Sequence, residues 1–186
     1  MANPEVPFLL EANTREKPSF VLSGEIGAST AVEMLNWLGH WGQECPEEQL
    51  TVFIDSIGGD LNPAITIAEA FRISPNRIRT IAMGRCYSAA TVIAAAGDKG
   101  ERYAYPKADF MIHQVRISGE LQESVSELEE TTKQFKRWHE IMLGLVSEFT
   151  GKPISQIRKD VVKEKYMTAD QARDYGLIDQ IIPYKK

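Results

Sequence analysis

Three short stretches of the chain contain residues whose types could carry out nucleophilic catalysis. Ser88 precedes an alanine-rich segment, His113 follows an apolar segment, and Gly58 and Gly59 form a double glycine. A serine attacks a carbonyl carbon only when a base such as histidine removes its proton, and amide N–H groups must stabilise the oxyanion that forms. The double glycine lets the backbone approach a ligand, and the N–H of Ala89, at a helix start, is a second candidate donor.

Each of these residues also has a simpler interpretation. A serine before a helix commonly acts as an N-cap, a histidine at a strand end commonly makes only structural hydrogen bonds, and a double glycine commonly forms a tight turn. His139, on the apolar stripe of a long helix, is interpreted as a packing residue, and His40 as a surface residue. The catalytic interpretation therefore depends on where the fold places Ser88 and His113.

Strands and helices alternate along the chain and must position these residues. Strands are expected at residues 19–23, 50–54, 77–83, 103–104, 109–112 and 177–182. Helices are expected to start near residues 30, 62, 88 and 168. This alternation, with continuous apolar strands, predicts an α/β fold around a largely parallel sheet. Reactive groups in such sheets gather at the carboxyl ends of the strands, and the serine, the histidine and the double glycine all follow strands.

Helical patterns predict which faces are buried. The Thr30–Glu33 capping-box spacing predicts a helix that buries Val32, Leu35, Leu38 and Trp41. From residue 121 to residue 149, apolar residues recur at alternating spacings of four and three, which predicts one long amphipathic helix of ~42 Å. Because a compact domain of this size needs no helix of that length, we expect its end to pack on another subunit.

Composition narrows the class of protein. The 186 residues fit a single domain, and a net charge of −5 with scattered Lys and Arg side chains argues against nucleic-acid binding. No basic leader and no apolar run of ~18 residues is visible, so we expect a cytoplasmic protein without a membrane segment. Cys45 is expected to be a surface thiol and Cys86 a buried one, both reduced. No metal or organic cofactor is expected.

Four segments in the same order resemble the proteolytic subunit of the Clp protease (ClpP), a serine peptidase. They are Phe53–Gly59, Gly84–Ala89 with the following Ala94–Gly100, Met111–Gln114 and Met167–Asp179. The resemblance covers about residues 21–182. It implies an α/β fold of the ClpP/crotonase type, a spiral of ββα units with a long protruding handle helix. The whole of 1–186 is then a single ClpP-like peptidase domain, with an N-terminal arm at 1–18 and a handle region at 118–150.

Carried over residue by residue, the family's nucleophile falls on Ser88 and its general base on His113. Its oxyanion-hole amides fall on Gly59 and Ala89. Its catalytic aspartate falls on Glu164, which can orient a histidine but is one methylene longer. Asp160, four residues earlier, is the alternative triad acid if that segment is helical.

The chain departs from the family beside these residues. Val115 and Ile57 replace prolines, and the segment after His113 keeps only Gly119 of a glycine-rich stretch. The arm before Ser19 is shorter than expected for the loops by which the family engages an ATP-driven AAA+ unfoldase. Docking of an unfoldase therefore stays open.

The resemblance implies a serine endopeptidase that acts on peptide or unfolded protein substrates. It also implies a homo-oligomeric ring, a heptamer or a double heptamer, that encloses the sites. Two alternatives stay open: a catalytically inactive ring subunit with a misaligned triad, and an acyl-CoA enzyme of the crotonase fold. Absence of fluorophosphonate labelling in the wild-type protein would favour the first, and acyl-CoA turnover that survives Ser88→Ala would favour the second.

Overall fold

The structure of the chain, a computed structural model, describes residues 18–117 and 124–184. Its seven strands are β1 (Ser19–Ile26), β2 (Leu50–Gly59), β3 (Ile78–Tyr87), β4 (Arg102–Ala104), β5 (Asp109–Ile112), β6 (Lys165–Thr168) and β7 (Gln180–Ile181). They form one sheet, whose main path has the order β1-β2-β3-β4-β7 with every neighbouring pair parallel. Outside this path, β5 pairs with β3 in a parallel arrangement, and β6 pairs with β5 in an antiparallel one. The expected α/β fold with a largely parallel sheet is confirmed.

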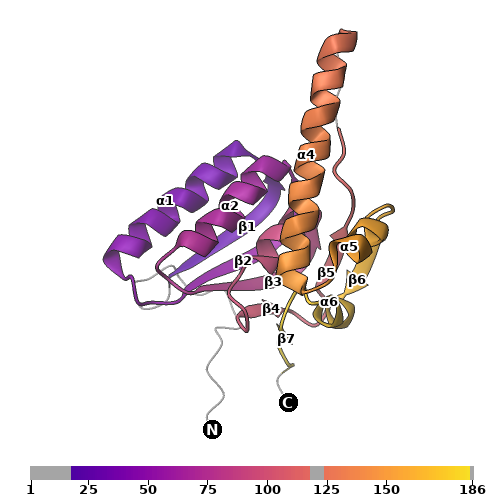
Figure 1. Cartoon of the computed structure of the whole chain (residues 1–186). Coiled ribbons are helices and arrows are strands. Elements are labelled where there is room, and N and C mark those ends of the chain that lie inside the picture. Colours follow the sequence, from indigo (N-terminus) through magenta and orange to yellow (C-terminus); the bar gives the residue numbers. More distant parts are fainter. Residues whose placement is uncertain (1–17, 118–123, 185–186) are drawn as a thin grey trace.

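Six helices complete the described part of the chain. They are α1 (Ala28–Glu44), α2 (Leu61–Ile73), α3 (Ala89–Ala95), α4 (Val125–Thr150), α5 (Ile154–Asp160) and α6 (Ala169–Tyr175). Helices α1 and α2 lie side by side over one face of the sheet, whereas α4 stands upright and projects beyond the other elements (Figure 1). Within the described ranges, none of these helices has the length and apolar character needed to cross a membrane.

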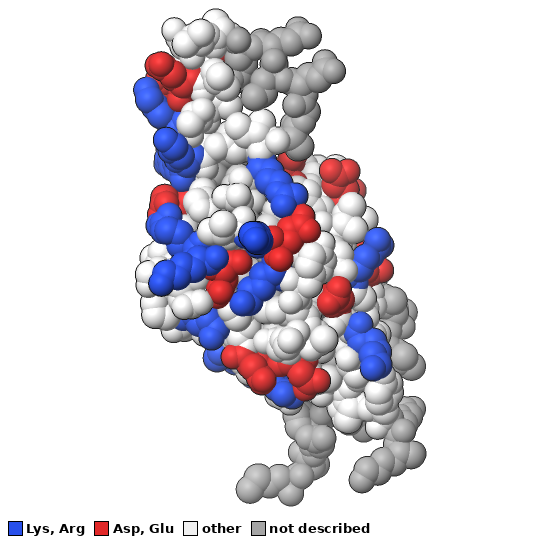
Figure 2. Space-filling view, turned by 90° about the vertical axis from the view of Figure 1, so that its right-hand side faces the viewer, with Lys and Arg blue, Asp and Glu red and all other residues white. Residues whose placement is uncertain are grey.

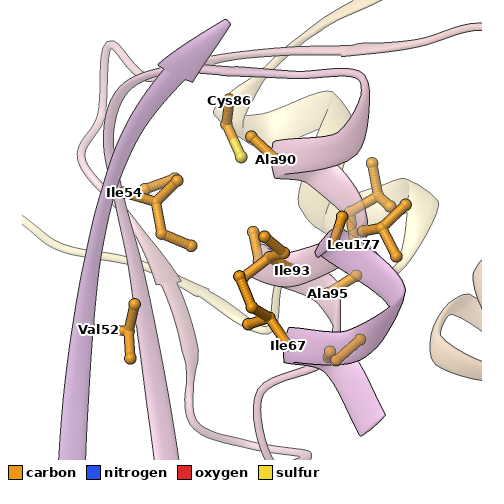
Figure 3. Close-up of a cluster of buried hydrophobic side chains, with 14 of the residues drawn as sticks. Val52, Ile54, Ile67, Cys86, Ala90, Ile93, Ala95 and Leu177 are labelled. Atoms are coloured by element: carbon orange, nitrogen blue, oxygen red, sulfur yellow. The ribbon is translucent and has the colours of Figure 1, made fainter. Parts of the chain in front are cut away.

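The main core lies between the sheet and helices α2 and α3. Figure 3 shows Val52 and Ile54 of β2 facing Ile67 of α2 and Ile93 of α3, and all four side chains are fully buried. The apolar run of β2 is buried on both faces of the sheet, because Val52 and Ile54 pack in the main core and Phe53 packs in a second cluster with Ile81, Tyr103 and Ile182. This packing fixes where β2 and β3 end, and therefore where their end residues lie.

The buried face of α1 differs from the expectation. The helix begins at Ala28 with Gly27 as N-cap. The N–H of Gly27 donates a hydrogen bond to the hydroxyl of Thr30, the third residue of the helix. Val32 and Leu35 are 59% and 40% exposed. The buried residues are Ala31, Met34, Trp37, Leu38 and Trp41. The expectation for Val32 and Leu35 was wrong because a neighbouring stripe, which includes two tryptophans, buries more apolar surface.

Other boundaries also differ. Helix α4 begins at Val125, where Ser124 and Glu127 form a capping box, and the expected start at residues 121–123 lies outside the described residues. Helix α2 takes Asp60 rather than Asn62 as its N-cap. Cys45 is buried, not a surface thiol, because it packs in the main hydrophobic core; Cys86 is buried as expected, and both thiols are outside disulfides.

Charged side chains are mixed on the face that includes α4. Figure 2 shows Lys and Arg side chains interspersed with Asp and Glu side chains over this face. Several of them are paired, as in the contact of Arg158 with Glu140, in which both guanidinium nitrogens lie 2.6 Å from a carboxylate oxygen. The face therefore presents alternating charges rather than a field of one sign.

Candidate active site

Ser88 lies on a sharp turn between β3 and α3. Its φ of 54° and ψ of −120° make it the one non-glycine residue with positive φ in the described part of the chain. Such a conformation costs free energy in an L-residue and persists where surrounding contacts impose it, often at functional sites. The turn carries the Ser88 side chain out of the sheet at the first residue before the helix.

Hydrogen bonds join this turn to the end of β5. The Ser88 N–H donates to the carbonyl of Met111 at 2.7 Å. The Thr91 hydroxyl, in the first turn of α3, is buried and lies 2.7 Å from the Cys86 carbonyl and 3.0 Å from the Met111 carbonyl. These contacts fix the end of β3 against the strand that leads into His113.

The structure brings Ser88 and His113 together. The Ser88 Oγ lies 2.7 Å from the Nε2 of His113, and the serine side chain makes no capping bond to the helix that it precedes. In the tautomer with its proton on Nδ1, Nε2 accepts the hydroxyl hydrogen. The alternative interpretation of Ser88 as a side-chain N-cap is therefore wrong.

Gly58 of the double glycine packs against Ser88, and Gly59 packs against the backbone of Ile26. Strand β2 continues through Asp55–Gly59 instead of ending in a turn, because it pairs with β1 as far as Ile26. A Cβ added at Gly58, whose φ is 93°, would lie 2.9 Å from the Cβ of Ser88 and 3.1 Å from the N of Ala89. Only glycine permits this approach. The N–H groups beside Gly59 already have acceptors, Ser56 Oγ for Gly58 and the Ile26 carbonyl for Asp60.

A cavity of about 600 Å³ opens beside these residues. Both glycines, Ser88, Ala89 and His113 line it at one side. Apolar side chains of α4 line it as well; they are Phe135, Trp138, Met142 and Val146. The volume suits several residues of an extended peptide or a small ligand. The long helix therefore serves as one wall of the site in addition to projecting from the fold.

His113 is held in its neutral form. Burial lowers the pKa of His113, the Arg116 guanidinium lowers it further, and the Glu164 carboxylate raises it in opposition. The neutral imidazole is the form that can act as a base. Its Nδ1 is buried and has no hydrogen-bond partner among the described residues.

The Glu164 carboxylate interacts electrostatically with His113, but its hydrogen bonds are to other side chains. Its Oε1 accepts a hydrogen bond from Arg116 Nη2 at 2.9 Å, and its Oε2 accepts one from the Tyr166 hydroxyl at 2.9 Å. These two bonds lower the pKa of Glu164, so that the carboxylate is ionised. The structure thus places the expected triad acid beside His113 without a bond between them.

Asp160 has a different environment. It ends α5 and Glu164 lies beyond the helix, so the two do not share a helical face. The Asp160 carboxylate accepts hydrogen bonds from the Tyr175 hydroxyl at 2.7 Å and from Lys165 Nζ at 3.2 Å. Burial favours its neutral form, but hydrogen bonds from Tyr175, Gln156 and Lys165 outweigh burial and lower its pKa. Asp160 therefore anchors the first residue of β6, next to Glu164.

Sequence reasoning missed three residues near the site. Arg116 and Tyr166 hold Glu164, and Thr91 ties the ends of two strands together. Arg116 could have been noticed as a lone cation in an otherwise uncharged stretch, whereas a tyrosine and a threonine in such positions carry no distinctive signal. Cys86 is no rival nucleophile, because burial raises the pKa of its thiol and keeps it protonated.

Comparisons with known proteins agree with this geometry. Residues 12–185 match the family model described as Clp protease. The ATP-dependent Clp protease proteolytic subunit 2 of Mycobacterium leprae is 36% identical over 141 residues, 76% of this chain and 66% of that protein. Subunit 1 of Mycolicibacterium paratuberculosis is also 36% identical over 76% of this chain and 67% of its own length. Subunit 3 of Nocardia farcinica is 34% identical over 76% of this chain and 64% of its own length.

The matched region thus spans about two thirds of the length of these relatives. The family model, by contrast, accounts for nearly every residue of this chain. The order of strand ends, the strained serine and the adjoining histidine all fall inside the matched region. This chain belongs to the Clp protease family.

Proposed function

We propose that this protein is a serine endopeptidase that hydrolyses peptide bonds in peptide or unfolded protein substrates. The observation that carries the proposal is the 2.7 Å contact between Ser88 Oγ and His113 Nε2 at the edge of a 600 Å³ cavity. A hydroxyl in contact with a neutral imidazole is the arrangement that activates a serine for attack on a carbonyl. The names of the relatives, proteolytic subunits of a Clp protease, support the same reaction.

The proposed reaction has two stages. Ser88 Oγ attacks the carbonyl carbon of the scissile peptide while His113 Nε2 takes the hydroxyl proton. The intermediate then breaks its C–N bond, and His113 returns the proton to the leaving amine. In the second stage, water attacks the ester carbon while His113 takes a proton from it. The bond between this carbon and Ser88 Oγ then breaks, and His113 returns the proton to Oγ as the acid product leaves.

The N–H groups of Gly59 and Ala89 are the proposed donors to the oxyanion. Ala89 is the first residue of α3, where backbone N–H groups have no partner within the helix. Gly59 follows Gly58, which packs against Ser88, and Gly59 lines the same cavity. Two donors placed before the reaction begins stabilise the developing charge without reorganisation.

Glu164 is the proposed triad acid. The tautomer that activates Ser88 carries its proton on Nδ1 of His113, and this buried nitrogen lacks an acceptor in the described residues. An ionised carboxylate beside it would hold that tautomer and stabilise the imidazolium. Asp160 is less suited, because three other side chains already use its carboxylate.

We also propose that the protein works as a homo-oligomeric ring, a heptamer or a pair of heptamers, which encloses the sites. Support comes from α4, whose projecting part exposes Val125 and Leu128 by 77% and 44%. Apolar surface on a projecting helix is stabilised by packing on another subunit. A molar mass measured by light scattering tests this, with Leu128→Glu expected to lower the mass and the adjacent Glu129→Gln expected to leave it unchanged.

Labelling with a fluorophosphonate probe tests the proposed chemistry. We expect the wild-type protein to be labelled and Ser88→Ala to be unlabelled. An unlabelled wild-type ring would instead indicate an inactive subunit. Turnover of an acyl-CoA that survives Ser88→Ala would indicate an acyl-CoA enzyme and exclude the serine mechanism.

A further inference from the structure

The proposed triad acid Glu164 and the proposed base His113 are not joined by a hydrogen bond in the structure. Glu164 uses one carboxylate oxygen for Arg116 and the other for Tyr166. His113 Nδ1 is buried with no acceptor in the described ranges. A buried N–H without a hydrogen-bond acceptor is unfavourable. Movement of the Glu164 carboxylate to His113 would supply an acceptor for the Nδ1–H and remove this cost.

Arg116 is the group best placed to oppose that movement. It is the single Lys or Arg side chain among the described residues that line the cavity, and it lies three residues after His113. The charged groups that act on His113 are Arg116, which lowers its pKa, and Glu164, which raises it. Arg116 therefore weakens the base in two ways, by its own charge and by holding the carboxylate.

We propose that Arg116 is a positioning residue that limits the rate of acylation by holding Glu164 away from His113. The triad is complete only in molecules in which the Arg116–Glu164 ion pair is open. This inference rests on the proposed serine peptidase activity and adds a determinant of its rate. It assigns no contact with substrate to Arg116.

Exposure sets the size of the effect. The Arg116 and Glu164 side chains are 56% and 36% exposed, so water screens their attraction. Exposed ion pairs contribute little, which limits the gain from removing Arg116 to roughly two- to fivefold in rate. Arg116 therefore tunes the base without abolishing catalysis.

The experiment compares five variants with the wild-type protein. Arg116→Gln removes the charge, and Arg116→Lys keeps it. Arg173→Gln is the matched control, because Arg173 also forms exposed ion pairs, with Asp170 and Asp174 on α6. The double variant Arg116→Gln/Glu164→Gln is compared with Glu164→Gln alone, which shows whether any gain requires the carboxylate.

Two quantities are measured in each variant. The first is the rate constant for labelling of Ser88 by a fluorophosphonate probe. The second is the pKa of His113 from the NMR titration of its imidazole, which is tractable because the chain has three histidines. We expect Arg116→Gln to react about two- to fivefold faster and to show a raised His113 pKa. Arg116→Lys and Arg173→Gln are expected to match the wild-type protein.

The inference is overturned if Arg116→Gln reacts at the wild-type rate or more slowly, or if its gain is equally large without the Glu164 carboxylate. If no variant is labelled, the proposed activity fails, and the His113 pKa decides the inference by itself. A rise that needs Glu164 then supports the positioning role of Arg116. A rise of equal size without the Glu164 carboxylate, or no rise, overturns it.

Discussion

Ser88 Oγ and His113 Nε2 lie 2.7 Å apart, although 25 positions separate the residues in the chain. The contact depends on the parallel pairing of β3 with β5, which aligns Tyr87 with Met111. Two residues that each follow a strand are thereby brought to the same edge of the sheet. The pairing explains why a serine and a histidine with ordinary sequence surroundings can act together.

Two substitutions at Ser88 separate its chemistry from its conformation. Ser88→Ala and Ser88→Gly both remove the hydroxyl, and both are expected to lower peptidase activity by roughly 10³-fold or more. Glycine also relieves the strain of a φ of 54°. The free energy of unfolding of Ser88→Gly is therefore expected to exceed that of Ser88→Ala by about 1 kcal/mol, with a higher melting temperature. Calorimetry and hydrolysis of a fluorogenic peptide measure the two effects.

The contrary result is equally specific. Equal melting temperatures of the alanine and glycine variants would show that the turn is not strained. Retained activity in either variant would show that another group is the nucleophile.

Gly58→Ala tests the close approach of the two strand ends. The new Cβ would lie 2.6 Å from the Tyr87 carbonyl oxygen and 2.9 Å from the Ser88 Cβ, at a φ of 93°. We expect a loss of at least about 2 kcal/mol in the free energy of unfolding and the loss of probe labelling, since Ser88 must shift.

Gly39→Ala is the control for this substitution. Gly39 is exposed on α1, and nothing lies within 4 Å of an added Cβ. Alanine there should stabilise the helix by about 0.5–1 kcal/mol and leave labelling unchanged. Similar losses in the two variants would mean that the effect is not specific to the site.

The sequence predicted the parts of the site that depend on strand order. Ser88, His113 and Gly58 follow apolar strands, and continuous apolar runs indicate parallel strands whose ends meet. The sequence could not place the Glu164 carboxylate, because it lies in a short connection between α5 and β6 where no periodicity applies. Its choice between His113 and Arg116 depends on side-chain charges that only the folded chain brings together.

Errors in the fold have a similar cause. The expected face of α1 used Val32 and Leu35, although Met34 and Trp37 form a competing stripe one position away. Periodicity shows that a helix is amphipathic, but tertiary packing decides which stripe is buried. In α1 the buried stripe includes Trp37, whose ring centroid lies 5.5 Å from that of Phe20 of β1. Local pattern could not rank the two stripes.

The pH dependence of hydrolysis follows from the lowered pKa of His113. Burial, then the Arg116 charge, lowers this pKa below its ordinary value of about 6.5. The base is neutral above its own pKa, so kcat/KM should fall on acidification with a midpoint below pH 6.5 and stay level near neutrality. A midpoint above pH 7 would contradict the assigned environment.

The same shift affects stability with a definite sign. Between the folded pKa and the ordinary value, the unfolded chain binds more protons at His113 than the folded chain does, so His113 lowers stability as the pH falls through this window. Urea unfolding at pH 5.5 and 7.5 should therefore show a smaller stability difference in His113→Asn than in the wild-type protein. An unchanged difference would contradict the shift.

Asp179 is expected to control stability at lower pH. Its carboxylate binds Arg102, which is 1% exposed, through contacts of 2.6 Å and 2.9 Å. Burial opposes ionisation, but the bonds from Arg102 dominate and lower the pKa of Asp179 to about 2. The pair contributes stability above the ordinary pKa of about 3.9, and this stability is lost as the pH falls toward 2.

Removal of this carboxylate leaves a buried guanidinium without its partner. Asp179→Asn is expected to lose roughly 3–5 kcal/mol in the free energy of unfolding at pH 7. Its unfolding should also depend less on pH between 4 and 2 than that of the wild-type protein. A loss below about 1 kcal/mol at pH 7 would show that the Phe149 and Ala95 carbonyls, which already accept hydrogen bonds from Arg102 at 2.9 Å and 3.4 Å, are sufficient partners.

Glu164→Gln and Asp160→Asn distinguish the two candidate acids. The amide at residue 164 cannot hold the His113 tautomer, so we expect kcat to fall by more than about tenfold with little change in melting temperature. Asp160→Asn weakens bonds to Lys165 and Tyr175, so it should lower the melting temperature and affect kcat less. If both substitutions change kcat equally and slightly, neither carboxylate completes a triad, and Ser88 and His113 act as a dyad.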